Sequence, residues 1–384
     1  MPCYAPPAML FERGEGTYLM TDNGDKYLDF TSGIGVNSLG HCHPHVVEAL
    51  KNQADKLWHT SNMFRIEAAE ILSERLAKLT FADVMFFANS GAEANECGIK
   101  AIRRYHYDNG DKKRTRLIGM TNSFHGRTIA TVGASGNAAY CKGFIPNDYH
   151  FDQAEFGNIE SLKSMITDNT AGVIIEPIQG EGGITVADKD YLKQVRELCD
   201  ENGILLMFDE VQCGVARSGH LYVYQALGVV PDVLTSAKGI GAGFPLGVCM
   251  ANEKVGKHMV IGTHGSTFGG NPLATTVGNA VLDIVTEPEF LQSVTDKGEY
   301  LQSQLKSLSK KHPNIYGEVT GLGLMIGIKV TPTNGDMLVA LRDKHHVLVV
   351  KAGGNSLRFL PPLTVSKEEI DVLIEALDKV ASDF

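Results

Sequence analysis

Two apolar runs that end in charged residues constrain this 384-residue chain more than any other feature of its sequence. Residues 204–208 form a continuous apolar run, typical of a strand buried on both faces, and Asp209 and Glu210 follow it directly. Residues 232–235 predict a second short buried strand, which is followed by Lys238 in a glycine-rich loop. Because ligands of open α/β sheets bind beyond the carboxyl ends of the strands, we expect Asp209 and Lys238 at one ligand site.

The amine of Lys238 and the carboxylate of Asp209 are the two groups that pyridoxal 5'-phosphate requires from a protein. The aldehyde of this cofactor reacts with an amine, and its ring nitrogen stays protonated beside an anion, which makes the ring a strong acceptor of electrons. The competing interpretation is a structural ion pair, but the desolvation of two charges makes buried ion pairs costly. The pair therefore predicts pyridoxal 5'-phosphate as the cofactor.

Two longer motifs extend this prediction to a protein family. The runs DEVQCGVARSG at 209–219 and SAKGIGAGFPLG at 236–247 resemble the class III pyridoxal-phosphate aminotransferases, and among them the acetylornithine aminotransferase group. The resemblance covers nearly the whole chain. It implies an α/β protein of fold type I, whose large domain has a mostly parallel seven-stranded sheet flanked by helices and whose smaller domain is α+β. It also implies that Lys238 and Asp209 are catalytic.

The composition is compatible with an enzyme of two domains. A hydrophobic content of 43% over this length supplies one large core and a smaller one. The net charge of −10 argues against nucleic-acid and acidic-membrane partners, and the charged run at 111–116 is interpreted as a solvated loop. The sequence shows neither a long apolar span nor the pattern of a signal peptide, and its seven cysteines lack paired spacing. We therefore expect a cytoplasmic protein with free thiols.

The expected domains follow the order of the predicted elements. Residues 1–45 form the N-terminal segment of the small domain, 46–271 the large cofactor-binding domain, and 272–384 a linking helix with the C-terminal small domain. Alternating runs on both sides of Asn23 and Gly24 predict a hairpin in the first segment. Residues 246–251 are expected to form an antiparallel edge strand of the large domain.

Three closely spaced histidines have a pattern that is also found among metal ligands. His41, His43 and His45 would share one face of an extended segment. Pro44, however, begins a predicted helix that runs to about Lys56, and this helix breaks the extended spacing. We therefore predict no metal.

A turn of small residues provides a candidate phosphate site. Residues 84–88 predict a strand, and a helix is predicted to begin directly after it. A helix N-terminus exposes N–H groups, and the lack of bulk at Gly91 and Ala92 lets an anion approach them. Ordinary strand-to-helix turns have the same composition. The family resemblance implies that Gly91 and Ala92 hold the cofactor phosphate, and that Thr267 reaches it from the neighbouring subunit of a homodimer.

The remaining cofactor contacts are implied by the resemblance. Phe124 stacks on the pyridine ring, with core packing as the alternative, and Val211 packs against the opposite ring face. Gln212 lies near the ring hydroxyl, and Glu210 belongs to the same cofactor-binding set.

The resemblance also implies four substrate-binding residues. The planar guanidinium of Arg127 suits the substrate α-carboxylate, with a surface cation as the alternative. Glu181 lies in a glycine-rich loop, where it is either solvated or an active-site carboxylate, and Ser266 lies beside the substrate. Arg358 lies in a predicted apolar strand and therefore needs a partner.

The function implied is transfer of the terminal (δ) amino group of N2-acetylornithine to 2-oxoglutarate, which gives N-acetylglutamate 5-semialdehyde and glutamate and belongs to arginine biosynthesis. Aminotransferases for ornithine, succinylornithine, succinyldiaminopimelate or 4-aminobutyrate remain alternatives, because they share the cofactor residues. Ile34 stands where ornithine aminotransferases carry an aromatic residue, which weakens that alternative. A cofactor-binding regulator without catalytic activity is an alternative of another class.

Overall fold

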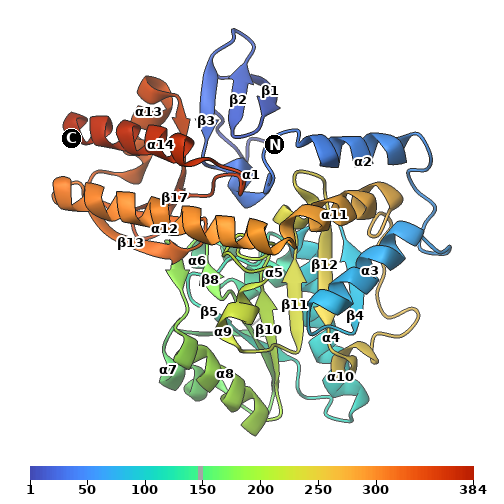
Figure 1. The fold of residues 1–384 in the computed structure, drawn as a ribbon. Coiled ribbons are helices and arrows are strands. Elements are labelled where there is room, and N and C mark those ends of the chain that lie inside the picture. Colours follow the sequence, from blue (N-terminus) through green and yellow to red (C-terminus); the bar gives the residue numbers. More distant parts are fainter. Residues whose placement is uncertain (146–149) are drawn as a thin grey trace.

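The computed structural model describes residues 1–145 and 150–384, and the strands of these residues form four sheets (Figure 1). The largest has seven strands in the order β4-β12-β11-β10-β7-β5-β6. Its strands are β4 (Val84–Ala88), β5 (Arg116–Met120), β6 (Phe151–Ala154), β7 (Thr170–Ile175), β10 (Leu205–Asp209), β11 (Val233–Ser236) and β12 (Gly247–Ala251).

This sheet is mostly parallel, as predicted, but one strand position differs from the prediction. β12 pairs antiparallel with β11 on one side and with β4 on the other. The expectation of an edge strand at 246–251 is therefore wrong, because β4 occupies the edge. An antiparallel strand need not lie at the edge of a sheet. Here β4, the first strand of this sheet in the chain, pairs with the outer side of β12 and forms the edge itself.

The side chains of β10 alternate between two cores. Leu206 and Phe208 pack into the largest hydrophobic cluster, whereas Leu205 and Met207 pack into a second cluster. This double burial explains why the strand has no polar residue before Asp209. Helices beside the sheet add side chains to these cores, namely α3 (Glu67–Leu79), α4 (Gly91–Asp108), α5 (Ile129–Ala134), α7 (Ile159–Met165), α8 (Lys189–Glu201), α9 (Val223–Leu227) and α10 (Glu253–Gly256). The short helix α6 (Ala138–Cys141) has no buried residue.

The two four-stranded sheets lie above the large sheet in the view of Figure 1. One contains the predicted hairpin, and its order β1-β2-β3-β15 joins the two ends of the chain. The strands are β1 (Phe11–Glu15), β2 (Tyr18–Thr21), β3 (Lys26–Asp29) and β15 (Val347–Leu348), and in the other sheet β13 (Tyr316–Leu322), β14 (Met325–Val330), β17 (Ser356–Phe359) and β16 (Val350–Ala352). A short pair consists of β8 (Ile178–Gln179) and β9 (Thr185–Val186).

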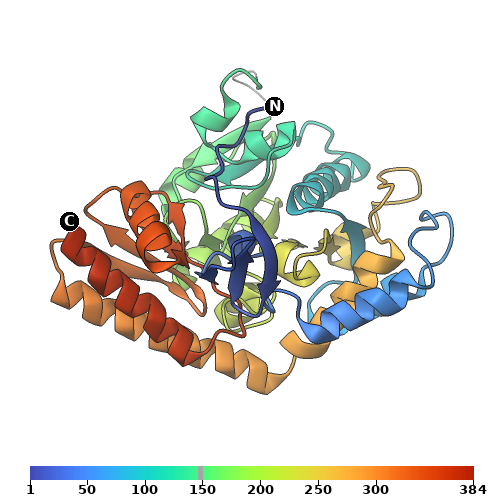
Figure 2. The same cartoon turned by 90° about the horizontal axis from the view of Figure 1, so that it is seen from above.

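Long helices pass from the large sheet to the C-terminal sheet. Figure 2 shows α11 and α12 following one another along one side of the molecule, with α14 beside α12. The remaining helices are α1 (Ser32–Gly35), α2 (Pro44–Ala54), α11 (Pro272–Val285), α12 (Pro288–Lys311), α13 (Asn334–His345) and α14 (Lys367–Val380), and the short 3-10 segments are η1 (Lys238–Gly241), directly after β11, and η2 (Ala381–Asp383).

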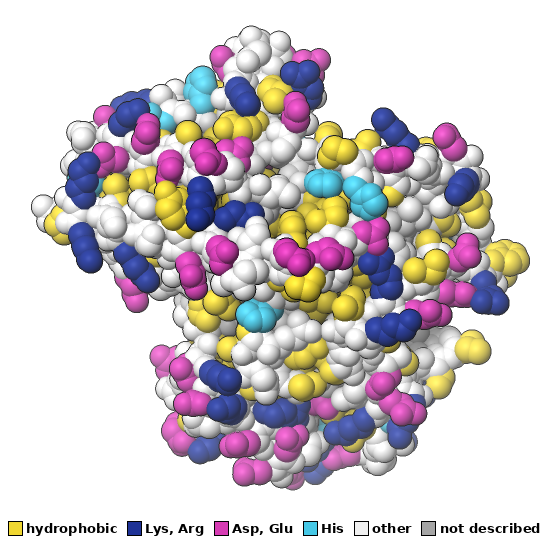
Figure 3. All heavy atoms as spheres, viewed as in Figure 1, with side chains coloured by type: hydrophobic (Ala, Val, Ile, Leu, Met, Phe, Trp, Pro, Cys, Tyr) yellow, Lys and Arg dark blue, Asp and Glu magenta, His cyan; other side chains and the backbone are white. Residues whose placement is uncertain are grey.

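The surface carries charges of both signs. On the face shown in Figure 3, acidic and basic side chains intermingle. In the charged run at 111–116, Arg114 and Arg116 are partly buried and pair with Asp111 and Asp152, so only part of that run is a solvated loop. None of the helices in the described part of the chain has the length and apolarity needed to cross a membrane.

Candidate active site

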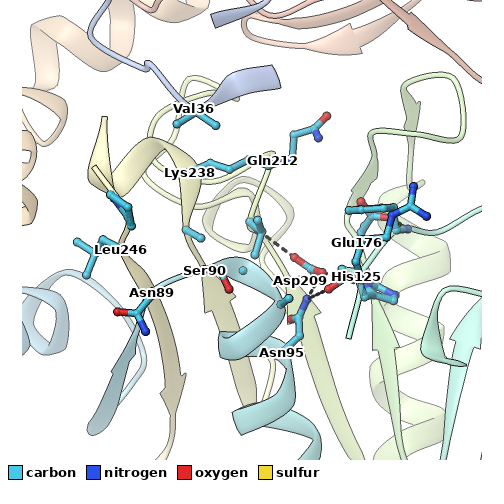
Figure 4. A pocket seen from close by; sticks show the side chains of 18 of the residues that line it. Val36, Asn89, Ser90, Asn95, His125, Glu176, Asp209, Gln212, Lys238 and Leu246 are labelled. Atoms are coloured by element: carbon cyan, nitrogen blue, oxygen red, sulfur yellow. Dashed lines mark hydrogen bonds and ion pairs between the residues drawn. The ribbon is translucent and has the colours of Figure 1, made fainter. Parts of the chain in front are cut away.

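A cavity of about 460 Å³ lies beyond the carboxyl ends of three neighbouring strands of the large sheet (Figure 4). Glu176 follows β7, Asp209 ends β10, and Lys238 follows β11, and all three line the cavity. Asp209 and Lys238 therefore lie together beyond the carboxyl ends of their strands, as their positions in the sequence predict.

Asp209 is buried at the cavity wall and has three hydrogen-bond partners. Its Oδ2 atom lies 2.7 Å from Nδ2 of Asn95 and 2.8 Å from Nδ1 of His125, and its Oδ1 atom accepts a hydrogen bond from the amide of Val211 at 3.0 Å. Asp209 follows Leu205 and Met207 in the strand alternation, so its side chain lies on the α4 side of the sheet, where Asn95 is located. These donors compensate for the loss of water around a buried carboxylate.

Glu176 is a second buried carboxyl group close to Asp209. It accepts a hydrogen bond from the amide of Phe124 at 3.0 Å. Burial raises the pKa of Glu176 to about 7, the charge of His125 acts against that rise, and the charge of Asp209 adds to it. Near neutral pH the cavity therefore holds one carboxyl group that can exchange a proton beside Asp209.

Lys238 enters the cavity from a strained position. Its φ of 48° lies in the left-handed region, which a non-glycine residue adopts at a cost in free energy. Burial and the charge of Arg358 lower the pKa of Lys238 to about 8, while Asp209 and Glu181 act in the opposite direction. Within the described residues, Nζ of Lys238 has no hydrogen-bond partner, so the amine is available to a bound molecule.

The N-terminus of α4 forms another wall of the cavity. Ser90 caps the helix through the amide of Glu93, and Gly91 and Ala92 line the cavity. A Cβ atom at Gly91 would lie 2.6 Å from Cγ1 of Val211, so only glycine lets the helix start approach that side chain. The first N–H groups of the helix have no partner within the helix and suit an anion.

These features fit pyridoxal 5'-phosphate. One cavity offers an amine with a lowered pKa, a buried carboxylate and an anion-binding helix N-terminus, which match the aldehyde, ring nitrogen and phosphate of the cofactor. The cavity also has a volume typical of small-molecule sites.

Four other predicted residues line the same cavity, namely Phe124, Arg127, Val211 and Gln212. The guanidinium of Arg127 lies over the ring of Tyr140, 3.9 Å from its centroid, and 5.4 Å from that of Phe124. Among the described residues it pairs with no carboxylate. Arg127 is therefore a cation that a substrate carboxylate can pair with.

Glu210 lies outside the cavity. It is completely buried and accepts hydrogen bonds from the amides of Val223 and Tyr224 at the start of α9. Burial raises the pKa of Glu210 to about 8, against the effect of these two amides. Adjacent residues of an extended segment point to opposite sides, so Asp209 and Glu210 cannot both face the cavity.

Arg358 and Glu181 form an ion pair next to the cavity. Nη2 of Arg358 donates to Oε1 of Glu181 at 2.8 Å, and Nη1 donates to Oε1 of Gln212 at 2.9 Å. Arg358 is 1% exposed, whereas the Glu181 side chain is 32% exposed. The arginine thus has the partner that its position in an apolar strand requires, and Gln212 connects it to the cavity wall.

Ser266 and Thr267 line a different cavity of about 380 Å³. Asn89 lines both cavities, and its Nδ2 atom lies 3.4 Å from Oγ of Ser266. Within a single chain, Thr267 is therefore not brought to the cavity that contains Lys238.

Sequence reasoning missed Asn95, His125 and Glu176. Glu176 follows a buried strand in the same way as Asp209, so the rule that identified Asp209 could have identified it too. Asn95 lies four residues after Gly91, on the helical face that begins at the small-residue turn. His125 is adjacent to Phe124 and carried no separate signal.

Two of the three histidines near the N-terminus pair with separate carboxylates. His41 pairs with Asp29 at 2.8 Å, and His45 pairs with Asp283 at 2.9 Å. The described residues contain no group of three or more histidine, cysteine, aspartate or glutamate side chains arranged to hold a metal ion.

Comparison with known proteins adds independent information. The family described as Aminotransferase class-III matches residues 3–381. The acetylornithine aminotransferase of Agrobacterium fabrum is 50% identical over 366 residues, which are 95% of this chain and 92% of that protein. The structure of N-acetylornithine aminotransferase from Stenotrophomonas maltophilia aligns with a TM-score of 0.87 at 34% identity, over 99% of this chain and 97% of that one. The ornithine aminotransferase of Toxoplasma gondii aligns with a TM-score of 0.94 at 31% identity, over 100% and 92%.

Proposed function

Because this chain belongs to the class III aminotransferases, which depend on pyridoxal phosphate, we propose that it transfers the terminal (δ) amino group of N2-acetylornithine to 2-oxoglutarate. The products are N-acetylglutamate 5-semialdehyde and glutamate, a step of arginine biosynthesis. The observation that carries the choice of donor is that relatives 45–50% identical over most of the chain are named acetylornithine aminotransferase. As an aminotransferase the protein is an enzyme, which rules out the non-catalytic regulator.

The geometry of the cavity supports the roles that we propose for its residues. Bound pyridoxal phosphate supplies an aldehyde that accepts the amino group and a ring that stabilises negative charge on the substrate carbon. Lys238 would anchor the cofactor through Nζ, and once the substrate amine has displaced it, the same amine would move the proton of the substrate carbon, because its lowered pKa keeps part of it neutral. Asp209 holds negative charge beside the ring nitrogen, and Asn95 and His125 fix the orientation of its carboxylate.

The other cavity residues bind the rest of the cofactor and the substrate. Gly91 and Ala92 would offer amides to the phosphate, and Phe124 and Val211 would hold the ring by apolar contact, since all four residues line the cavity. Arg127 binds the α-carboxylate of the substrate. Gln212, which lines the cavity, would bind the ring hydroxyl, and Glu210 would support the cofactor indirectly, because it holds the segment that contains Asp209 and Val211.

The choice of donor is tested by competition. The cofactor-loaded enzyme receives equal concentrations of acetylornithine, ornithine, succinylornithine, succinyldiaminopimelate and 4-aminobutyrate, and the consumption of each donor is measured in single turnovers. Acetylornithine should be consumed with a kcat/KM at least tenfold above that of ornithine and 4-aminobutyrate, because a site built for an acylated amine leaves the free α-amine of ornithine unpaired and is left without its acylamino group by 4-aminobutyrate. Preference for another donor of the set would reassign the substrate.

The Glu181–Arg358 ion pair is proposed to let one site bind two different substrates in turn, acetylornithine when the amino group is taken up and 2-oxoglutarate or glutamate when it is passed on. Glutamate carries a second carboxylate and acetylornithine does not, so one site must offer Arg358 to the first and mask it from the second. Glu181→Gln should leave Arg358 unpaired and shift the kcat/KM ratio of glutamate over acetylornithine upward by about tenfold, the scale of a charged hydrogen bond.

Glu318→Gln is the matched control for this prediction. Glu318 pairs with Lys329 at 2.7 Å on an exposed surface and does not line the cavity. An unchanged substrate ratio in Glu181→Gln would contradict the proposal that Glu181 masks Arg358, as would an equal change in both variants.

A homodimer with shared active sites is proposed from the loop that carries Ser266 and Thr267. This loop is held to residues 57–64 by hydrogen bonds from Asn62 to the carbonyls of Ser266 and Gly269. Both segments expose large apolar side chains, namely Leu57, Trp58, Met63, Phe64, Val260, Ile261 and Phe268. Such a patch is typical of a protein interface, and dimerisation would bring Thr267 to the partner's cofactor phosphate and Ser266 beside its substrate.

Hybrid dimers test this arrangement. When Lys238→Ala and Thr267→Ala subunits are mixed and allowed to exchange, shared sites give one site with both lesions and one with neither. Each hybrid should then show about half of the wild-type activity, because one of its two sites is intact. If Thr267 served its own chain, each site would keep one lesion and mixing would restore nothing.

The compartment and the domain boundaries are proposed as well. The seven free cysteines suit a reducing compartment, so we assign the enzyme to the cytoplasm. The pairing of β3 with β15 supports one small domain made of residues 1–45 and 272–384, with 46–271 as the large domain.

A further inference from the structure

Among the described residues, an aromatic ring and no carboxylate holds the guanidinium of Arg127. Its central carbon lies 3.9 Å from the centroid of the Tyr140 ring. Tyr140 is partly buried in α6 and does not line the active-site cavity, whereas Arg127 lines the cavity and is exposed. An exposed arginine has many rotamers, so contact with the ring restricts where its guanidinium can lie.

The packing of α5 and α6 brings the two residues together. Arg127 lies just before the start of α5, and Tyr140 lies within α6. The thiol of Cys141 donates to the carbonyl of Val132 at 3.6 Å, which joins the two helices. The rings of Tyr140 and Phe124 meet edge to face, with their centroids 6.0 Å apart. The Tyr140 ring is therefore held in place beside the cavity wall.

The contact with Tyr140 leaves the N–H groups of Arg127 available to a ligand. All N–H bonds of a guanidinium lie in its plane. The ring faces this plane, because an N–H group pointing at the ring would place a nitrogen between the ring and the central carbon and hold the two further apart than 3.9 Å. A ring in this position orients the arginine without using the donors that bind a carboxylate.

The other arginine near the cavity is held in the opposite way. Arg358 is paired with the carboxylate of Glu181 at 2.8 Å. A carboxylate partner competes with the carboxylate of a substrate, whereas a neutral ring does not. Acetylornithine and glutamate both carry a carboxylate, but only glutamate carries two. The proposed reaction therefore needs one arginine that is always available and a second one that can be masked.

We propose that Tyr140 is a positioning residue, which holds Arg127 ready for a substrate carboxylate in both half-reactions. This inference rests on the proposed function, in which Arg127 binds that carboxylate. The contact uses the face of the ring and does not require the phenol hydroxyl. Phenylalanine should therefore replace Tyr140, and an aliphatic residue of similar size should not.

The test measures the binding of glutarate, an unreactive dicarboxylate, to cofactor-loaded enzyme by titration calorimetry. Tyr140→Leu should raise the Kd about fivefold, the scale of a cation–π contact at an exposed site. Tyr140→Phe should keep the Kd within about twofold of the wild-type value, because the ring remains. Arg127→Gln should raise the Kd by about tenfold or more, since the charged partner of the carboxylate is lost.

Tyr107→Leu is the matched control. Tyr107 also lies beside an arginine, with the central carbon of Arg104 at 5.6 Å from its ring centroid, but neither residue lines the active-site cavity. This variant should bind glutarate like the wild type. The absorption spectrum of the bound cofactor should be unchanged in Tyr140→Leu. An altered spectrum would indicate a structural effect through Phe124 and would overturn the positioning role.

The outcomes separate this inference from the proposed function. If Tyr140→Leu bound glutarate as tightly as the wild type, or if Tyr140→Phe weakened binding equally, the role of Tyr140 would be refuted. An unchanged Kd in Arg127→Gln would refute the carboxylate site itself. N-acetylnorvaline, which is acetylornithine without its terminal amine, tests the donor separately. Its failure to bind would refute that donor, while the glutarate series still decides the role of Tyr140.

Discussion

Replacement of Lys238 by alanine is expected to reduce turnover by about 10⁶-fold, the loss typical of removing a catalytic nucleophile, while the protein stays folded. The fold does not depend on the amine, because Nζ of Lys238 makes no hydrogen bond within the described residues. No other lysine lines the cavity in the described part of the chain. The measurements are the rate of amino transfer and the circular dichroism spectrum of the variant.

The comparison variant is Lys297→Ala. Burial also lowers the pKa of Lys297 to about 8, but its amine donates to the carbonyl of Leu363, away from the cavity. It should retain catalysis in the folded fraction. Borohydride reduction of the cofactor-loaded wild type, followed by peptide mapping, should attach the cofactor to Lys238. Attachment to another lysine would refute the assignment.

Asp209→Asn is expected to slow proton removal from the substrate carbon by several orders of magnitude. The amide has the shape of the carboxylate but not its charge, so the ring nitrogen is no longer held protonated and the ring becomes a weaker acceptor of electrons. Cofactor binding through the start of α4 should largely persist, because Gly91 and Ala92 are unchanged. Single-turnover kinetics with a substrate deuterated at the reacting carbon measure the step directly.

Asp232→Asn separates this effect from a general loss of stability. Asp232 is also a mostly buried aspartate with a basic partner, Arg196, but it precedes β11 and so lies at the opposite edge of the sheet. That variant should unfold more easily and yet react at the wild-type rate when folded. Near-normal proton removal in Asp209→Asn would mean that the anion beside the ring nitrogen lies elsewhere.

The main elements of the site could be predicted because they depend on local rules. A buried strand that ends in a charge places that charge at the ligand edge, which brought Asp209 and Lys238 together. The same rule also applies to Glu176, which directly follows the buried strand β7. Glu210 shows the limit of the rule, because the alternation of an extended segment turns every second residue away from the cavity.

The features that the sequence did not predict depend on contacts between segments that are distant in the chain. Asn95 and His125 reach Asp209 only because α4 and the segment after β5 pack on the same side of β10. The position of β12 between β11 and β4 follows from the overall strand order, which no single stretch of sequence determines. The partial burial of Arg114 and Arg116 likewise depends on Asp111 and Asp152, the second of which comes from the neighbouring strand β6.

The order of the strands also governs when this protein can fold during synthesis. β4 leads into the helix whose N-terminus lines the active-site cavity, yet it pairs with β12, which the ribosome makes only after the strands β5, β6, β7, β10 and β11. β3 can pair with its neighbour β15 only later still, because β15 lies near the end of the chain. Contacts this distant in sequence form slowly and leave unpaired strand edges exposed in the meantime. The nascent chain therefore has to remain protected from aggregation until most of it has been made, and cofactor binding comes as a late event.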